Sequence, residues 1–256
     1  MRASFMSSSY RVFVGSVQPQ AGQFFRASPL FAARIDYGCE SFRLDASTLQ
    51  CHIAIMTKIN TVCVYCGSGA GTNPNYIAAA KALGKAFAES GIRLVFGGGS
   101  VGMMGAVATA VLDHGGMVTG IIPDFLTLRE NALTRVQEMV VTPDMHERKR
   151  LMFERSDAFV ALPGGIGTLE ELVEQLTWQQ LGRHSKPVLL ANIDGFWEPL
   201  FDLLAHMRAT QFIRQGFAVE ILKADRVEEI LPKLRSAAAH IPDSAREMAP
   251  EIARRL

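Results

Sequence analysis

"DAFVALPGGIGTLEELVEQL", residues 157–176, joins an apolar run to a glycine-rich turn and then to a second apolar pattern. The first six residues have the composition of a buried strand. After the turn, apolar side chains recur at Leu169, Leu172, Val173 and Leu176, which is the spacing of one helix face. The stretch therefore predicts a strand, a glycine turn and the start of a helix, which is the repeating unit of a parallel α/β sheet.

The same alternation of short β-rich runs and amphipathic runs continues from Asn60 onward. It predicts a single α/β domain in which helices cover both faces of a doubly wound parallel sheet. We expect strands near 60–66, 92–97, 117–122, 136–141, 157–162 and 187–192, with a weaker one near 217–222. We expect helices near 75–90, 101–114, 144–155, 168–182, 197–211 and 226–238.

The two ends of the chain differ from this domain, which we place at residues 58–240. Residues 1–57 form a leader that is rich in arginine before its first acidic residue, Asp36, as in an organellar transit peptide. Met56 stands just before the first predicted strand, which favours an unstructured or mistranslated leader. Residues 241–256 form a charged tail.

The composition is that of an ordinary globular protein, with 48% hydrophobic residues, 20% charged residues and a formal net charge of +1. These values argue against a disordered or membrane-spanning chain. They also lack the basic excess that drives nucleic-acid binding. We therefore expect neither a nucleic acid nor a membrane as partner.

The chain has four cysteines, too few and too unevenly placed for a disulfide framework: Cys39, Cys51, Cys63 and Cys66. This pattern favours a reducing compartment, and we predict a cytoplasmic location. Cys63 and Cys66 form a C-x-x-C motif, but it lies at the end of an apolar strand. Core packing is therefore a better interpretation than a redox or metal site, and we expect no metal or cofactor.

Glycine-rich turns follow three of the predicted strands, at Gly67–Gly69, Gly97–Gly99 and Gly164–Gly167. The carboxyl ends of parallel strands meet at one edge of the sheet, where ligands bind. Backbone N–H groups and helix N-termini at such turns can hold a phosphate. Any one turn could simply be a tight connection. Together they predict a nucleotide-sized anionic ligand.

Neither of two common nucleotide-binding fingerprints is complete. Gly97–Gly102 satisfies G-x-G-x-x-G, but it follows the second strand, and no acidic residue ends the next strand. The Walker pattern G-x-x-x-x-G-K-[ST] is absent from the sequence, which argues against an ATPase or kinase. A mononucleotide or sugar phosphate is the better candidate.

Two interpretations fit the glutamates that end the third turn. Thr168 and Glu171 could form a capping box, which would be purely structural. However, the wheel places Glu171 away from the apolar stripe and free to face a cleft, and the box does not explain Glu170 or the glycines. We therefore favour a catalytic or ligand-binding role for Glu171.

A basic run, Met145–Arg150, begins the helix before the fifth strand. It could be a solvated face, the usual role of a charge run. However, the apolar residues that follow tie this helix to the core and bring its start near the glycine turns. Arg148 can bind a phosphate or carboxylate through two parallel hydrogen bonds, so we expect it to orient a ligand.

Met145–Lys149 and Pro163–Glu171 resemble the paired signature of the "lonely guy" family, usually written PGGxGTxxE. The resemblance runs from about Lys58 to Lys233 and includes Val62–Ser68 and Gly97–Gly105. The family consists of cytokinin riboside 5′-monophosphate phosphoribohydrolases, some of them long mislabelled as lysine decarboxylases. Ile166 stands where an aromatic residue is frequent in the family.

The resemblance implies a Rossmann-like homodimer that cleaves the N-glycosidic bond of an N6-modified adenosine monophosphate, giving free base and ribose 5-phosphate. It implies that Arg148 and Glu171 are the catalytic pair. The substrate-binding residues would be Gly67, Ser68, Gly98, Gly99, Met104, Glu130, Lys149, Gly164, Gly165, Ile166, Gly167, Thr168, Leu169, Glu170 and Thr177.

Three other functions stay open. The protein could hydrolyse nucleoside 5′-monophosphates such as AMP in general. It could carry a nucleotide or cofactor without reacting, but such a carrier would not need Glu171 and Arg148. A decarboxylase would need pyridoxal phosphate on a lysine, and Lys149 is the lysine beside the motifs.

The helix after the third turn also predicts how copies associate. Its wheel places Trp178 with Glu171, Glu174 and Gln175 on the outer face, away from the core. Tryptophan is enriched where proteins meet. Trp178 could instead fold against a neighbouring helix of its own chain, but we favour a two-fold dimer around this helix.

Overall fold

The computed structural model describes residues 34–37, 40–43, 59–127, 131–213 and 220–240. The chain divides into two compact units, Met1–Gln50 and Cys51–Leu256. In the first unit, β1 (Arg34–Tyr37) pairs with β2 (Glu40–Arg43) in antiparallel fashion. Most of the predicted leader and the whole predicted tail lie outside the described residues.

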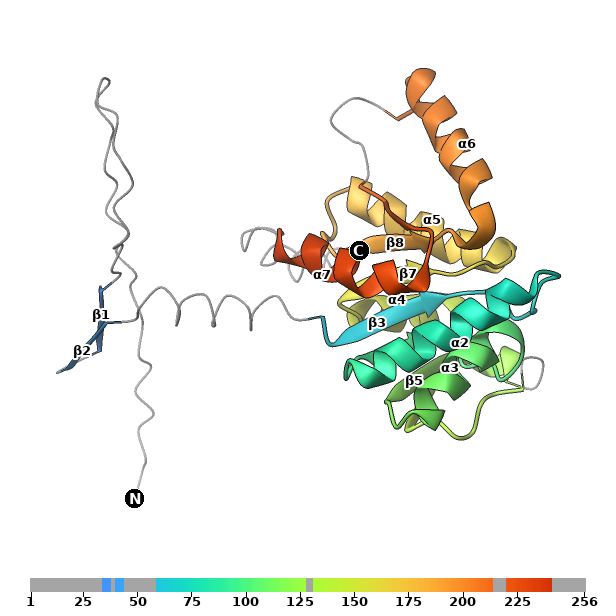
Figure 1. The fold of residues 1–256 in the computed structure, drawn as a ribbon, viewed down its shortest axis with the longest axis horizontal. Coiled ribbons are helices and arrows are strands. Elements are labelled where there is room, and N and C mark those ends of the chain that lie inside the picture. The colour runs from blue at the N-terminus through green and yellow to red at the C-terminus, as the bar shows by residue number, and fades with distance from the viewer. Residues whose placement is uncertain (1–33, 38–39, 44–58, 128–130, 214–219, 241–256) are drawn as a thin grey trace. The chain divides into compact units, whose positions relative to one another are not determined.

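The second unit is built on a seven-stranded parallel sheet, in the order β6-β5-β4-β3-β7-β8-β9 (Figure 1). The strands are β3 (Thr61–Tyr65), β4 (Arg93–Phe96), β5 (Val118–Pro123), β6 (Glu138–Thr142), β7 (Ala158–Ala161), β8 (Val188–Ala191) and β9 (Leu222–Ala224). The α-helices are α2 (Pro74–Glu89), α3 (Gly102–Asp113), α4 (Met145–Glu154), α5 (Ile166–Gln180), α6 (Glu198–Ala209) and α7 (Ile230–Ala239). The predicted fold class, a doubly wound Rossmann-like α/β sheet, is confirmed.

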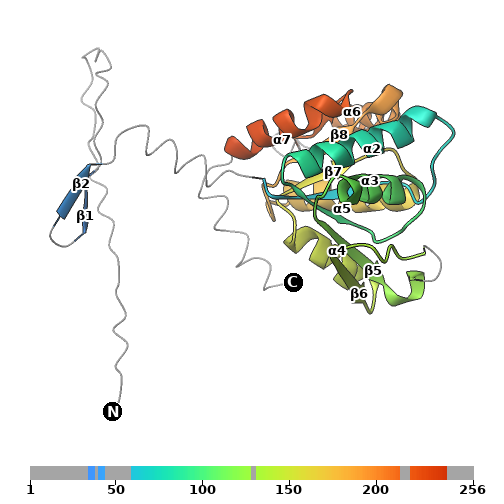
Figure 2. The ribbon, with the colours of Figure 1, turned by 60° about the horizontal axis from the view of Figure 1, so that its bottom comes forward.

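The central strands β3, β4, β7 and β8 are apolar except at Thr61 and Arg93, the first residues of β3 and β4, because helices cover the sheet from both sides. Residues of α2, α3 and α7 pack on one face, and residues of α4 and α5 pack on the other. Figure 2 shows α2 and α7 on one side of the sheet and α4 on the other. The predicted elements are all found, although β9 begins at Leu222, at the end of the stretch expected for it.

The order of the strands places the ligand crevice. From β3 the chain moves outward through β4, β5 and β6, and it then returns to β7 on the other side of β3. Ligands bind where the direction of winding changes, at the carboxyl ends of the strands. Here the turns after β3 and β7 touch, because the N–H of Gly67 donates to the carbonyl of Pro163 at 3.1 Å.

Cys63 and Cys66 are both buried and neither forms a disulfide bond, and they belong to the cores on opposite faces of the sheet. Side chains three apart on a strand point to opposite sides, so this C-x-x-C cannot form a shared site. Burial raises the pKa of the Cys63 thiol, with a further contribution from the charge of Glu171. The predicted packing role of both cysteines is confirmed.

Two searches of the described residues gave negative results. They contain no group of three or more histidines, cysteines or carboxylates placed to hold a metal ion. Among the same residues, no helix has both the length and the apolar character needed to cross a bilayer.

Candidate active site

Helix α5 begins three residues earlier than the capping-box interpretation requires. Its N-cap is Gly165, which has no side chain to cap the helix, and Ile166 is the first helical residue. Thr168 is therefore inside the first turn and buried, and its hydroxyl lies under Gly164. The capping-box interpretation of Thr168 and Glu171 is wrong, and Glu171 is not occupied in capping Thr168.

The buried face of α5 is rotated by roughly a quarter turn from the predicted one. Val173, expected in the core, is 44% exposed, whereas Gln175, expected outside, is fully buried. Glu171 is only 8% exposed. Its carboxylate lies on the sheet side of the helix, at the carboxyl edge of the strands. The polar residues Glu171 and Gln175 thus displace part of the apolar stripe from the core.

Trp178 was expected to face away from the core, and this prediction is wrong. Its ring packs edge-to-face on Phe153 of α4, with ring centroids 5.1 Å apart. The guanidinium of Arg183 covers the other side at 4.0 Å from the ring centroid. The ring of Trp178 is packed against residues of its own chain, so it gives no evidence for a dimer.

Arg148 reaches the site from the first turns of α4. Asp144 caps this helix by accepting a hydrogen bond from the N–H of Glu147 at 2.8 Å. The guanidinium of Arg148 is buried, and its Nε donates to the carbonyl of Ile121 at 3.2 Å. Its Nη2 lies 3.5 Å from the carbonyl oxygen of Gly97. The carbonyl ends of two neighbouring strands therefore fix the arginine.

Arg148 and Glu171 form a buried ion pair. Nη2 of Arg148 lies 3.6 Å from Oε1 of Glu171, and the two side chains are 7% and 10% exposed. Charges removed from water interact strongly, and taking away either one leaves the other uncompensated. The predicted catalytic residues are thus adjacent in space, although they come from different helices.

The pair faces a cavity of about 300 Å³ at the carboxyl edge of β3, β4 and β7. The lining of this reaction cavity combines polar groups, from the ion pair and the first turn of α5, with apolar side chains such as Val64 and Met104. The lining residues are Val64, Cys66, Gly67, Ser68, Gly97, Met104, Arg148, Gly165, Ile166, Gly167, Thr168 and Glu171.

The three glycine turns have different roles. The carbonyl of Gly67 accepts hydrogen bonds from the N–H groups of Met103 at 3.1 Å and Met104 at 3.3 Å. The first turn of α3 is therefore engaged by protein. The first turn of α5 borders the cavity instead, and the first N–H groups of a helix have no partner within it. The N-terminus of α5 thus borders the cavity, whereas that of α3 is bonded to the turn after β3.

Several predicted substrate-binding residues lie beside the cavity and not on its wall. Lys149 binds the carboxylates of Glu170 at 2.6 Å and Glu174 at 3.0 Å. The hydroxyl of Thr177 is exposed and donates to the carbonyl of Val173. The others are placed as follows: Leu169 packs on the core, Gly164 lines a neighbouring cavity, Gly98 and Gly99 pair with residues 132–133, and Glu130 lies outside the described residues.

The predicted substrate-binding set omitted three residues that line the cavity: Val64, Cys66 and Gly97. Gly97 could have been found, because it opens the second glycine turn. Cys66 could also have been found, because it lies at the carboxyl end of the first strand, directly before Gly67. Val64 could not, since it is a strand residue two positions further back with no polar group.

Comparison with known proteins identifies the family. The family described as "Possible lysine decarboxylase" matches residues 104–234. A probable cytokinin riboside 5′-monophosphate phosphoribohydrolase of Oryza sativa subsp. japonica, LOGL1, is 46% identical over 177 residues, which are 69% of this chain and 79% of the relative. LOG3 of Arabidopsis thaliana is 44% identical over 182 residues, 71% and 85% of the two chains. The chain belongs to the lonely guy (LOG) family.

The expected LOG membership is thus confirmed, and the matched range contains both Arg148 and Glu171. Solved structures of the same fold include the molybdenum cofactor carrier protein of Chlamydomonas reinhardtii, with a TM-score of 0.55 and 23% identity over 71% of this chain and 99% of the carrier. The molybdenum cofactor binding protein of Rippkaea orientalis has a TM-score of 0.54 and 26% identity over 70% and 97% of the two chains. These likenesses confirm the fold of this LOG protein.

Proposed function

We propose that the protein is a hydrolase that cleaves the N-glycosidic bond of a cytokinin riboside 5′-monophosphate, giving free base and ribose 5-phosphate. The observation that carries the proposal is the buried Arg148–Glu171 pair on the wall of a cavity that also contains an uncapped helix N-terminus. Relatives with 43–46% identity carry the name of this activity.

The proposed chemistry assigns Glu171 to the sugar. Breaking the bond between ribose and base builds positive charge on the sugar, and a nearby carboxylate stabilises that charge. The same carboxylate can orient the water whose oxygen bonds to C1′ as the base leaves. Because Glu171 is buried, its charge acts through a medium that screens it less than water does. Arg148 holds this carboxylate in place.

The first turn of α5 is assigned to the 5′-phosphate. Gly165 and Gly167 line the cavity, and a β-carbon built on either would meet no described atom within 4 Å. Nothing in the described protein therefore requires glycine at these two positions. A phosphate that approaches the backbone closely would require it, because a side chain would stand between the anion and the N–H groups.

The predicted substrate-binding set is retained as a proposal, with Gly97, Val64 and Cys66 added. Residues on the cavity wall would contact the substrate directly. Lys149 would act indirectly, by positioning Glu170, since its Nζ lies 2.6 Å from Oε1 of that glutamate. We propose that residues 58–240 form the functional domain, that the protein acts as a homodimer and that it is cytoplasmic. The two buried cysteines, neither of which forms a disulfide bond, are compatible with a reducing compartment.

A pyridoxal-dependent decarboxylase fits these residues less well. A lysine that forms a Schiff base must be neutral to attack. Burial lowers the pKa of Lys149, but its hydrogen bonds to Glu170 and Glu174 outweigh this effect, so that the pKa is raised overall. A protonated lysine that is held by two carboxylates is a poor nucleophile.

A panel of nucleotides tests the proposed function. Purified protein is incubated with a cytokinin riboside 5′-monophosphate, plain AMP, the matching nucleoside and the matching triphosphate, and free base is measured by chromatography. We expect free base from the monophosphate and little from the nucleoside. Equal rates of base release from the monophosphate and from the nucleoside would mean that α5 does not bind the phosphate. If none of the four compounds releases base, the proposed activity is wrong. Similar rates on AMP and the modified nucleotide would favour a general nucleosidase.

A further inference from the structure

The turn after β3 forms part of the wall of the reaction cavity, at Gly67 and Ser68. Glycine alternates with other residues from Gly67 to Gly71, so the backbone of this turn is only weakly restricted to one conformation. Its start is fixed by β3 and by the N–H groups of Met103 and Met104, which donate to the carbonyl of Gly67. Its other end leads into α2. The residues that hold the start of α2 therefore also decide where the turn lies.

A second cavity, of about 300 Å³, lies beside the same turn. It shares Gly67, Ser68 and Gly165 with the reaction cavity. A β-carbon added to Gly69, in the middle of the turn, would meet no atom within 4 Å. The turn therefore has space into which it can move, and packing alone does not keep it at the reaction cavity.

Asp194, in the loop after β8, is bonded to the start of α2. Its Oδ2 accepts hydrogen bonds from Nδ2 of Asn73 at 2.7 Å and from Nδ2 of Asn75 at 2.8 Å. Asn73 is also the N-cap of α2, since its Oδ1 accepts from the N–H of Asn75 at 3.0 Å. The hydrogen bonds from Asn75 and Asn73 lower the pKa of Asp194. Its carboxylate is thus charged at neutral pH, and a negative charge is favoured at a helix N-terminus.

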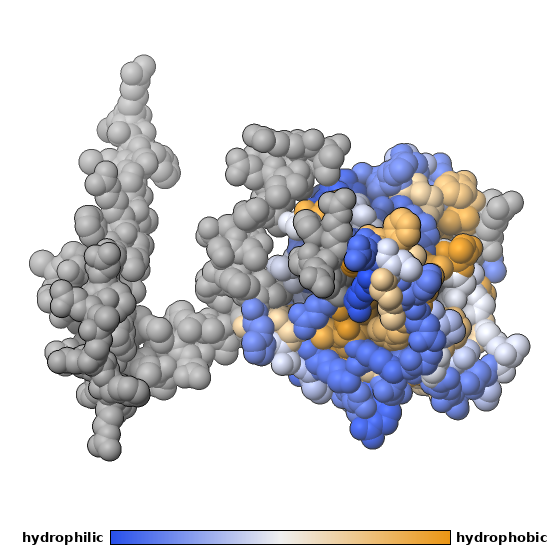
Figure 3. All heavy atoms as spheres, turned by 90° about the horizontal axis from the view of Figure 1, so that it is seen from above, coloured by the Kyte–Doolittle hydropathy of each residue, from blue (hydrophilic) through white to orange (hydrophobic). Residues whose placement is uncertain are grey.

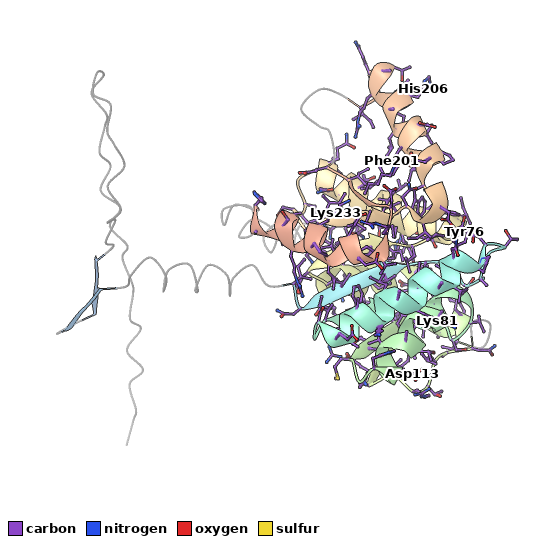
Figure 4. All side chains as sticks on the ribbon, viewed as in Figure 1. Tyr76, Lys81, Asp113, Phe201, His206 and Lys233 are labelled. Atoms are coloured by element: carbon purple, nitrogen blue, oxygen red, sulfur yellow. The ribbon has the colours of Figure 1, made fainter. Side chains whose placement is uncertain are left out.

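The backbone of Asp194 is strained. Its φ is 50° and its ψ is 36°, a left-handed conformation that residues other than glycine rarely adopt. Such strain persists where the surroundings impose it, and it is concentrated at functional positions. Here the surroundings include an edge-to-face contact between the rings of Phe196 and Tyr76, whose centroids are 5.5 Å apart. Figure 4 shows Tyr76 at the start of α2, near the base of α6.

Stability of the fold does not explain this arrangement well. The loop that carries Asp194 leads into α6, which extends toward the viewer in Figure 3, where polar and apolar residues are interspersed on the surface. Asp194 and Asn75 are exposed. Exposed hydrogen bonds add little to stability, because water offers the same groups other partners. The strained backbone and the two hydrogen bonds are better explained by the position that they give to the start of α2.

We propose that Asp194 is a positioning residue for the reaction, which holds the start of α2 and thereby keeps the turn Gly67–Gly71 at the substrate. The turn has no side chain that titrates near neutral pH, so its contribution is to bind and orient the substrate. Loss of such a contribution raises KM more than it lowers kcat. The kinetic part of this inference rests on the proposed function, whereas the effect of Asp194 on the turn does not.

Hydrogen exchange tests the effect on the turn without any substrate. The full chain is compared with Asp194→Ala, Asp194→Asn and a matched control, Asp157→Ala, by mass spectrometry of the peptides over residues 66–76 and 101–105. Asp157 is matched because its Oδ2 also accepts two hydrogen bonds, from the N–H groups of Asn60 and Thr61, each at 2.9 Å. It lies before β7, at the amino edge of the sheet and away from the reaction cavity.

We expect exchange in both peptides to be at least about fivefold faster in Asp194→Ala, because the amides of Met103 and Met104 donate to the turn. Asp157→Ala should leave both peptides unchanged. Asparagine tolerates the left-handed conformation, and its amide oxygen can accept both hydrogen bonds. Asp194→Asn should therefore exchange as wild type does.

Kinetics with a cytokinin riboside 5′-monophosphate test what the contact does for the reaction. We expect KM to rise about tenfold in Asp194→Ala, with kcat within about twofold of wild type, and to be restored in Asp194→Asn. Asn75→Ala removes one of the two hydrogen bonds, so it should raise KM by a smaller factor and add nothing when combined with Asp194→Ala. Asp157→Ala should lower the melting temperature and leave KM unchanged, as a purely structural contact would.

Unchanged exchange in folded Asp194→Ala would overturn the proposal, and so would an unchanged KM. If Asp194→Ala does not fold, Asp194→Gly takes its place, because glycine adopts the left-handed conformation without strain and also lacks the carboxylate. A wild type that releases no base, while exchange changes as expected, contradicts the proposed function alone. A wild type that releases base, with neither exchange nor KM altered in the variants, contradicts this inference alone.

Discussion

Gly97 and Arg148 are packed so closely that a β-carbon at position 97 would lie 2.3 Å from Nη2 of the arginine. The sulfur of Met104 closes the other side at 3.0 Å. The glycine that follows β4 thus makes the space in which the guanidinium reaches Glu171. The second glycine turn therefore affects the reaction cavity through the side chain of Arg148. This contact does not involve the backbone N–H groups of the turn.

Gly97→Ala should therefore displace Arg148 while leaving Arg148 and Glu171 chemically intact. Small displacements of a catalytic group can cost as much as a hundredfold in rate, so we expect base release to fall by roughly 10- to 100-fold. Steady-state kinetics and a melting curve check this. An unchanged rate would show that the position of the guanidinium does not matter to the reaction.

Substitutions of the glycines in the third turn should show that stability and substrate binding respond differently. Gly167 is helical and unobstructed, so Gly167→Ala should raise the free energy of unfolding by up to about 1 kcal/mol. If a phosphate approaches the backbone there, the same change should raise KM for the monophosphate. Urea unfolding and kinetics on one sample measure both.

Gly164→Ala is the matched comparison, because its β-carbon would lie 2.2 Å from Oγ1 of Thr168 and 2.8 Å from the backbone nitrogen of Gly67. It should destabilise the fold. A Gly167→Ala protein with unchanged KM would mean that the phosphate binds elsewhere.

The pattern of the sequence predicted the sheet and its helices well, because buried parallel strands and amphipathic helices leave strong periodic signals. It failed on the orientation of α5. The wheel assumed that apolar residues mark the core, but Glu171 and Gln175 face the sheet while Val173 faces out. Glu171 reaches the cavity wall from the buried face, with Gln175 one turn further along the same face, and periodicity alone cannot reveal this.

The same limit explains Trp178 and α6. Trp178 packs on Phe153, a contact between residues 25 positions apart that local spacing cannot predict. The sequence predicted α6 as an ordinary covering helix, whereas none of its residues is buried, and Leu200 and Phe201, near its start, are partly buried against the core. Arg148 and Glu171 were recognised from their motifs, but their distance is fixed by the packing of α4 and α5 on neighbouring strands.

Trp178→Ala should destabilise the protein and leave its association unchanged. The ring loses its contact with Phe153 and the covering Arg183, and because it is half-buried we expect a loss of about 2–3 kcal/mol in the free energy of unfolding. Chemical unfolding measures the loss, and light scattering checks the mass. If the variant keeps its stability but becomes monomeric, Trp178 contributes to the contact between two copies and not to the packing of its own chain.

Acid should destabilise the protein through His184. Burial lowers its pKa from 6.5 to about 4, with smaller contributions from the charges of Lys186 and Arg183. Between these values the unfolded chain binds a proton that the folded chain does not, so stability falls as the pH drops from 6.5 toward 4. The loss attributable to this histidine is at most about 3 kcal/mol.

His184→Gln should flatten this part of the pH profile, because glutamine can donate to the carbonyl of Gln175 as the ring does at 3.1 Å but does not titrate in this range. Unfolding midpoints in urea at pH 7.0, 6.0 and 5.0 compare the two proteins. The same slope in both would mean that other groups cause the acid sensitivity.

Turnover and binding of Glu171→Gln test the central claim most directly. The variant keeps the size of the side chain and removes its charge, so a role in stabilising charge on the sugar predicts a rate of base release at least about 100-fold lower. Binding of the monophosphate, measured by calorimetry, should remain within a few-fold of wild type, because the phosphate is held by the first turn of α5. A variant that stays folded and releases base at a near-normal rate would contradict the account.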